Sequence, residues 1–192
     1  CIHRFTGFAD ANFANLSDDE RKSNTGFIIF LFGCAICWRS KLQPITATST
    51  HEAELIACAS ASQEIIWCRK LLQDLGFALN LTPVKLSDPN RIRECLEDDG
   101  ITVSDEQYQL DPLWLFNDNL GTTQTINRPE SSSQRSKHID LRYYCVRQYV
   151  RDMNIRVACI GTDYNIADFF TKGLTYPKFS LFRKRIGLLS RR

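Results

Sequence analysis

Four acidic residues stand where their side chains could share one site: Asp10, Glu54, Asp118 and Asp168. Two of them end apolar runs typical of strands, and the other two lie in the first turns of predicted helices. Ligands of α/β proteins gather at strand ends and helix starts, so we expect the four carboxylates to converge. Converging carboxylates repel one another, and divalent cations remove that repulsion.

An all-oxygen set of ligands suits Mg2+, with Mn2+ as the alternative ion. Two such ions about 3.5–4 Å apart can promote displacement at a phosphodiester. The four acids therefore predict a two-metal site for phosphodiester chemistry. Each acid alone is equally well explained as a helix cap or a surface charge, so the prediction depends on their joint order and setting.

The strongest helical pattern carries Glu54. Ser49 and Glu52 match the S-x-x-E capping box at its start, and Gly76 is the expected C-cap. Its apolar face runs by steps of four and three through Glu54, Cys58, Ala61, Ile65, Cys68, Leu72 and Leu75. Glu54 should therefore point toward the sheet, where a carboxylate without a partner is costly. The alternative is a glutamate near the helix end that reaches solvent.

The remaining elements follow from periodicity and turn residues. Strands are expected at 5–10, 27–32, 35–39, 113–118 and 155–160, and further helices at 139–153 and 165–172. The first three strands could form an antiparallel meander. This order predicts an α/β fold in which a mixed five-stranded sheet is flanked by helices.

The composition is that of an ordinary soluble domain, with 192 residues, 43% hydrophobic and 24% charged. No apolar run is long enough to span a membrane, and no signal peptide is recognised, so we expect an intracellular protein. The chain opens on Cys1 and resembles a piece of something longer. The eight cysteines are expected to be reduced and mostly buried. Cys34 and Cys37 lack the second pair that a zinc site needs and are assigned to the core.

The charge is unevenly distributed. Residues 85–111 hold eight acidic and three basic residues, while the whole chain has a net charge of +2. The basic remainder could bind a polyanion, although solvated surface charge explains it equally well. Residues 83–112 are predicted to be an inserted acidic loop, with one short helix at 90–96, in a domain spanning 1–182. Residues 183–192 would form a basic C-terminal tail that either helps to hold nucleic acid or is simply solvated.

Five stretches match one family in order: GFADANFANLSDDERKSNTGFIIFLFGCAICWRSKLQP at 7–44, TSTHEAELIA at 48–57, FNDNLGTT at 116–123, RSKHIDLRYYCVR at 135–147 and NIADFFTKGL at 165–174. Over roughly 5–82 and 113–188 the chain resembles the ribonuclease H domain of copia-type retrotransposon Pol polyproteins. The resemblance implies a ribonuclease H-like fold and magnesium-dependent cleavage of the RNA strand of RNA–DNA hybrids. It places the family's acids at Asp10, Glu54, Asp118 and Asp168.

The resemblance also implies partners and a location. The partners are the RNA–DNA hybrid and the reverse transcriptase region of the same polyprotein. The location is cytoplasmic, in virus-like particles, with a nuclear phase. Contacts to nucleic acid are expected from the basic residues of the matching stretches and a neighbouring histidine, namely Arg39, Lys41, Arg135, Lys137, His138 and Arg142. Trp38 would either stack on a base or pack.

Several positions depart from the family pattern. The family has a tryptophan and a glycine–aspartate pair where this chain has Phe13, Asn15 and Leu16. Asn117 replaces a residue that is usually small. No histidine occurs in residues 161–165, so proton transfer would fall to water or Asp163. The unusual residues around Asp10 and Asp118, together with the insertion at 83–112, favour an alternative. This is a degenerate or domesticated copy that binds nucleic acid or supports a larger polymerase without cutting. The presence of all four acids opposes that alternative. A DNA strand-transfer enzyme on the same fold is disfavoured by the placement of the glutamate.

Overall fold

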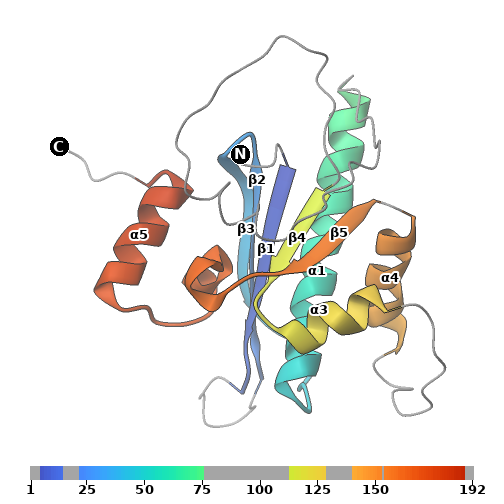
Figure 1. Cartoon of the computed structure of the whole chain (residues 1–192), viewed down its shortest axis with the longest axis horizontal. Helices are drawn as coiled ribbons and strands as arrows, with labels where there is room; N and C mark the ends of the chain where they lie inside the picture. The colour runs from blue at the N-terminus through green and yellow to red at the C-terminus, as the bar shows by residue number, and fades with distance from the viewer. Residues whose placement is uncertain (1–4, 15–21, 76–112, 129–139, 153, 189–192) are drawn as a thin grey trace.

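A five-stranded mixed sheet forms the centre of the computed structural model, which describes residues 5–14, 22–75, 113–128, 140–152 and 154–188 (Figure 1). The strands are β1 (Phe5–Asn12), β2 (Asn24–Leu31), β3 (Cys34–Leu42), β4 (Leu113–Asn117) and β5 (Ile155–Cys159), in the spatial order β3-β2-β1-β4-β5. Strands β1 to β3 form the expected antiparallel meander, and β4 and β5 run parallel to β1. The predicted fold class is confirmed.

The helices are α1 (Thr50–Asp74), α3 (Leu120–Asn127), α4 (Asp140–Arg151) and α5 (Tyr176–Ile186), with the short 3-10 helices η1 (Thr162–Tyr164) and η2 (Ile166–Phe170). Helix α3 was not predicted, because its glycine and three threonines are weak helix formers. The capping side chain of Asn119 stabilises its start. None of the helices in the described ranges is long and apolar enough to cross a membrane.

The two faces of the sheet are covered by different helices, with α1 and α4 on one side and α5 on the other (Figure 1). The face toward α1 buries one hydrophobic cluster, and the opposite face buries a second cluster that includes the fully buried Phe182 of α5. Because side chains alternate along a strand, β1 contributes Ala9 to the first cluster and Phe8 to the second. Asp10 shares the orientation of Phe8 and therefore faces η2 and α5.

Helix α1 follows its predicted pattern closely. Ser49 caps its start by accepting a hydrogen bond from the Glu52 backbone, and the Glu52 carboxylate accepts one from the backbone of Thr48. The predicted apolar face is buried from Glu54 through Leu72. Only Leu75 contradicts the pattern, because it lies at the helix end and is 65% exposed.

Other expectations need correction or lie outside the described residues. Cys34, Cys145 and Cys159 are exposed rather than buried, because they lie at the ends of edge strands or on an outer helix surface. The last predicted helix is the short 3-10 helix η2. Helix α5, which was not predicted, continues to Ile186 and contains the first three basic residues assigned to the tail. The proposed insertion at 83–112, the short helix within it and Gly76 lie outside the described residues.

The close approach of η2 to the sheet positions Asp168. The side chains of Asn24 and Ser40 donate hydrogen bonds to the carbonyl of Phe170, over 3.1 and 2.6 Å. Gly26 on β2 lies directly beneath this segment and pairs with Asp10 on β1. The absence of a side chain at Gly26 lets η2 approach the sheet beside Asp10.

Replacing Gly26 by alanine should lower the free energy of unfolding by about 1–3 kcal/mol, as overpacking typically does. A Cβ atom there would lie 2.5 Å from Thr171 Cγ2, 2.9 Å from Phe170 Cβ and 3.0 Å from the Ala167 carbonyl oxygen. Urea denaturation measures the loss. The control is Gly173→Ala, where nothing lies within 4 Å and the change should stay within about 0.5 kcal/mol. Equal stability of the two variants would show that η2 does not need this close approach.

Candidate metal centre

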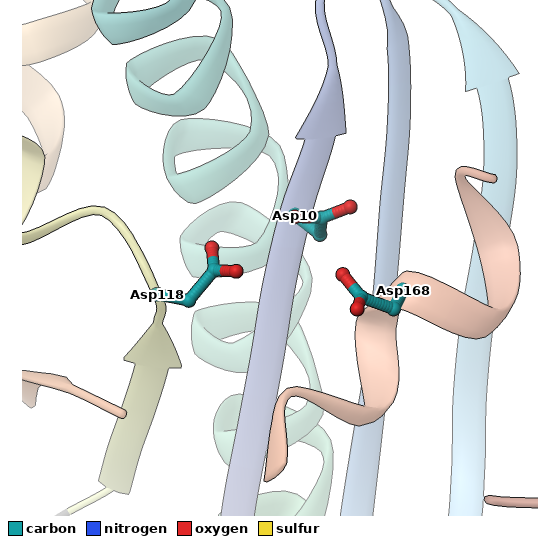
Figure 2. A group of neighbouring side chains, drawn as sticks. All are labelled: Asp10, Asp118 and Asp168. Carbon is teal, nitrogen blue, oxygen red and sulfur yellow. The ribbon is translucent and has the colours of Figure 1, made fainter. Parts of the chain in front are cut away.

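Three aspartates converge at the carboxyl ends of β1 and β4. One carboxylate oxygen from each of Asp10, Asp118 and Asp168 lies within 4.8 Å of the other two. Figure 2 shows Asp118 and Asp168 on either side of β1, which carries Asp10. Asp10 and Asp168 are almost fully buried, while Asp118 is partly exposed. The site is therefore open on the Asp118 side.

The parallel pairing of β1 and β4 explains how the first two aspartates meet. Phe8 pairs with Phe116, so Asp10 and Asp118, each two residues further on, reach the same edge of the sheet. Asp168 comes from η2, whose start is capped by the side chain of Asn165. The Asn165 amide also donates a hydrogen bond to the Ala9 carbonyl over 3.1 Å, which ties η2 to β1 one residue before Asp10.

Burial raises the pKa of Asp10 to about 6. A hydrogen bond from the Thr171 hydroxyl and the charge of Lys172 oppose this rise, whereas the charges of Asp168 and Asp118 add to it. The ionised form of Asp10 is therefore destabilised both by its loss of hydration and by two neighbouring negative charges. A cation at this point would relieve both effects.

Two lysines neutralise Asp168, whose carboxylate is fully buried. Lys172 Nζ lies 2.7 Å from Oδ1 and also 3.8 Å from Oδ2 of Asp10. Lys178 Nζ, from α5, lies 2.8 Å from Oδ2. Burial lowers the pKa of Lys172, but its hydrogen bond to Asp168 and the nearby charges of Asp10 and Asp168 outweigh this and raise the pKa overall.

Glu54 approaches from α1 but does not belong to the group within 4.8 Å. Its Oε2 accepts a hydrogen bond of 2.7 Å from the Asn117 amide, which also donates to the Ala9 carbonyl over 3.1 Å. Burial raises the pKa of Glu54 to about 8; the charges of Asp10 and Asp118 add to this effect, and the Asn117 hydrogen bond reduces it. The structure thus brings together three of the four predicted acids and places Glu54 beside them, pointing inward as its helical face predicted.

The residues predicted to contact nucleic acid differ in their exposure, and only some of them lie in the described part of the chain. Arg39 forms an ion pair with Glu64 and lies over the Phe27 ring, so it is engaged within the protein. Lys41 is exposed on β3. Arg135, Lys137, His138 and the side chain of Arg142 lie outside the described residues. Trp38 is 60% exposed, which leaves a stacking role open.

The residues that depart from the family pattern lie in different surroundings. Asn117 is fully buried and holds Glu54 in place. Phe13 is 37% exposed in the turn that directly follows β1, and its neighbours Asn15 and Leu16 lie outside the described residues. Asp163 is exposed in η1, where its Oδ1 lies 3.7 Å from Lys178 Nζ.

Three residues of the site were not predicted from the sequence: Thr171, Lys172 and Lys178. The sequence carried a signal for Lys172, because a lysine four residues after an aspartate faces it on a helical turn. Lys178 comes from a helix that was not predicted, and its contact depends on how α5 packs.

Comparison with known proteins agrees with this architecture. The chain is 32% identical over 184 residues to the retrovirus-related Pol polyprotein from transposon TNT 1-94 of Nicotiana tabacum, covering 96% of the chain and 11% of the relative. It is 30% identical over 182 residues to the corresponding polyprotein from transposon RE2 of Arabidopsis thaliana, covering 95% and 10%. The chain thus spans about a tenth of the length of these relatives. No protein-family model matches it.

Among solved structures, the fold is similar to the N-terminal RNase H domain of a Mycobacterium tuberculosis protein, with a TM-score of 0.50 and 10% identity. That likeness covers 87% of this chain and 95% of the other. A compost-derived RNase H1 gives a TM-score of 0.50 at 13% identity, covering 88% and 94%. At these identities the likeness concerns the fold. The chain therefore has a ribonuclease H-like fold and is similar, over almost its whole length, to one segment of retrotransposon Pol polyproteins. In this domain, the three aspartates lie in the stretches that carried the family resemblance.

The raised pKa of Glu54 makes stability depend on pH. In the unfolded chain this carboxyl group ionises near its ordinary pKa of 4.5, while the folded domain keeps it protonated up to about 8. Its contribution to stability is therefore fully present below pH 4.5 and is lost as the pH rises to 8. We therefore compare the free energy of unfolding of Glu54→Gln with that of the parent, both without metal. The variant's advantage over the parent should grow by more than about 1.4 kcal/mol between pH 5 and pH 8, which is the equivalent of one pKa unit.

Urea denaturation in the presence of a chelator, repeated across this pH range, measures that difference. The control is Glu52→Gln, the same substitution two residues away at a carboxylate that accepts hydrogen bonds from Thr48. Parallel curves for the parent and Glu54→Gln would contradict the placement of Glu54 as a buried, protonated acid.

Proposed function

We propose that this domain is a metal-dependent endonuclease that hydrolyses the RNA strand of RNA–DNA hybrids during retrotransposon reverse transcription. The observation that carries the proposal is the convergence of Asp10, Asp118 and Asp168 within 4.8 Å, with Glu54 beside them. Buried carboxylates that have no structural need to meet would be kept apart by their mutual repulsion. Their convergence on a ribonuclease H-like fold therefore supports catalysis more than stability.

The donor set fits Mg2+ or Mn2+, which prefer oxygen ligands, and the carboxylates of Asp10, Glu54, Asp118 and Asp168 would hold two such ions. When bound, the ions supply Lewis-acid chemistry at the scissile phosphodiester. Asp118, which is partly exposed, would lie on the substrate side of the site. Asp10 and Asp168 would form its buried floor.

The protein's own groups prepare the site in two ways. Thr171 orients Asp10 by donating a hydrogen bond to Oδ2, and Asn117 orients Glu54. Glu54, with its pKa raised to about 8, holds a proton near neutral pH and would release it when positive charge enters the site. Recognition of the hybrid would use its backbone and 2′-hydroxyl groups rather than base sequence.

The alternative is a degenerate copy that binds nucleic acid without cutting it. The specific observation in its favour is that Lys172 and Lys178 already pair with Asp168, and Lys172 also reaches Asp10. Such pairing would suit a site that no longer binds cations. The partly exposed Asp118 opposes this interpretation, because no ion pair to it occurs among the described residues.

The proposed function also implies binding partners and a cellular location for the domain. Its partners would be the hybrid and the reverse transcriptase region of the same polyprotein. It would act inside the cell, in cytoplasmic virus-like particles, with a nuclear phase.

The purified 192-residue chain with Mg2+ should cut the RNA of a labelled hybrid and spare duplex DNA. Asp10→Asn should abolish cutting while the protein still folds and binds the hybrid, because asparagine keeps the shape and removes the charge that holds the cation. Denaturing gels measure cutting, and gel shifts measure binding.

Glu54→Gln and Glu52→Gln form the matched pair for the glutamate. Glu54→Gln should cut far more slowly than Glu52→Gln, because the Glu52 carboxylate only caps α1, a contact that contributes about 0.5–2 kcal/mol to stability. Equal losses in the two variants would refute the assignment of Glu54. A parent that binds the hybrid but cuts with neither ion would favour the degenerate copy.

A further inference from the structure

Lys178 is held in place more tightly than an ordinary surface lysine. It lies in the first turn of α5, and its Nζ donates hydrogen bonds to Asp168 Oδ2 over 2.8 Å and to the Thr162 carbonyl over 2.9 Å. Asp163 Oδ1 lies 3.7 Å away, and the ammonium group lies 5.5 Å from the centre of the Phe182 ring. Its side chain is only 21% exposed. Lys178 thus joins η1, η2 and α5 at one point.

Phe182 fixes the helix that carries this lysine. It lies one turn further along α5 and is fully buried in the second hydrophobic cluster. The packing of α5 therefore determines where the Lys178 ammonium group lies, and that group in turn contacts Asp168. A side chain of the candidate metal centre is linked in this way to the C-terminal helix of the fold.

The two lysines that contact Asp168 occupy different sides of its carboxylate. Lys172 is 35% exposed and lies between the carboxylates of Asp168 and Asp10, where a cation would bind. Lys178 contacts Oδ2 from the α5 side and bonds to the protein through a second acceptor, Thr162. Lys172 can therefore move aside for a cation without disturbing the Lys178 contact.

We propose that Lys178 is a positioning residue that holds the Asp168 carboxylate in the orientation required for metal binding, so that docking of α5 completes the metal centre. The inference rests on the proposed function, because it takes Asp168 to be a metal ligand. Groups that orient ligands in this way typically change metal affinity or activity by about 10- to 100-fold when removed.

The sign of the effect separates positioning from simple charge neutralisation. Removing a positive charge near the acidic cluster should, by electrostatics alone, strengthen the binding of a cation. A positioning role predicts the reverse, because Asp168 would lose its fixed orientation and pair more fully with Lys172. Lys178→Met tests this directly, since methionine keeps an unbranched side chain over Phe182 and lacks the ammonium group.

The measurement is calorimetric titration of the 192-residue chain with MnCl2 alone, without nucleic acid. We expect Lys178→Met to raise the Kd for Mn2+ by about 10-fold or more. Lys178→Arg should fall between Lys178→Met and the parent, because a guanidinium keeps the charge and donors with a different geometry. The control is Lys184→Met, which removes an exposed lysine from the last turn of the same helix and should match the parent.

Unchanged or tighter Mn2+ binding by Lys178→Met would overturn the positioning role and leave the metal site itself intact. Should Lys178→Met fail to fold by circular dichroism, Lys178→Arg decides: weakened binding supports positioning, and affinity equal to the parent overturns it. Absence of Mn2+ binding by the parent would instead refute the proposed metal site, and the role of Lys178 with it.

Discussion

Mutual repulsion among buried carboxylates is the constraint around which this domain is built. Asp10, Asp118 and Asp168 lie within 4.8 Å of one another, and burial removes much of the water that would screen them. Each buried acid has a specific partner: Thr171 for Asp10, two lysines for Asp168, and Asn117 for Glu54. The lysines lie within ten residues of Asp168, but Thr171 and Asn117 reach Asp10 and Glu54 from segments far apart in the chain, so these contacts form only in the folded domain.

The contact between η2 and the sheet makes that assembly possible. Gly26 allows the segment to lie against β2, and hydrogen bonds from Asn24 and Ser40 to the Phe170 carbonyl secure it. Asp168 then reaches Asp10 across about 160 residues of sequence. A glycine beneath a short 3-10 helix is thus part of what places Asp168 beside Asp10.

The local patterns of the sequence predicted the five strands along the chain, the meander of the first three, the start of α1 and the inward orientation of Glu54. Those features depend on periodicity and capping within a few residues. The partners of the acids could not be predicted in the same way. Thr171 and Asn117 reach Asp10 and Glu54 through packing between distant segments, and Lys178 reaches Asp168 through the packing of a helix that was not predicted. Helix α3 was missed because its threonines favour other structures, and Cys34 was wrongly assigned to the core because β3 is an edge strand.

Anomalous diffraction from crystals grown with Mn2+ tests the central claim most directly. We expect manganese in contact with the carboxylates of Asp10, Asp118 and Asp168, with Lys172 moved away from the position between Asp10 and Asp168. Manganese bound only elsewhere, with Lys172 still bridging these two aspartates, would contradict it.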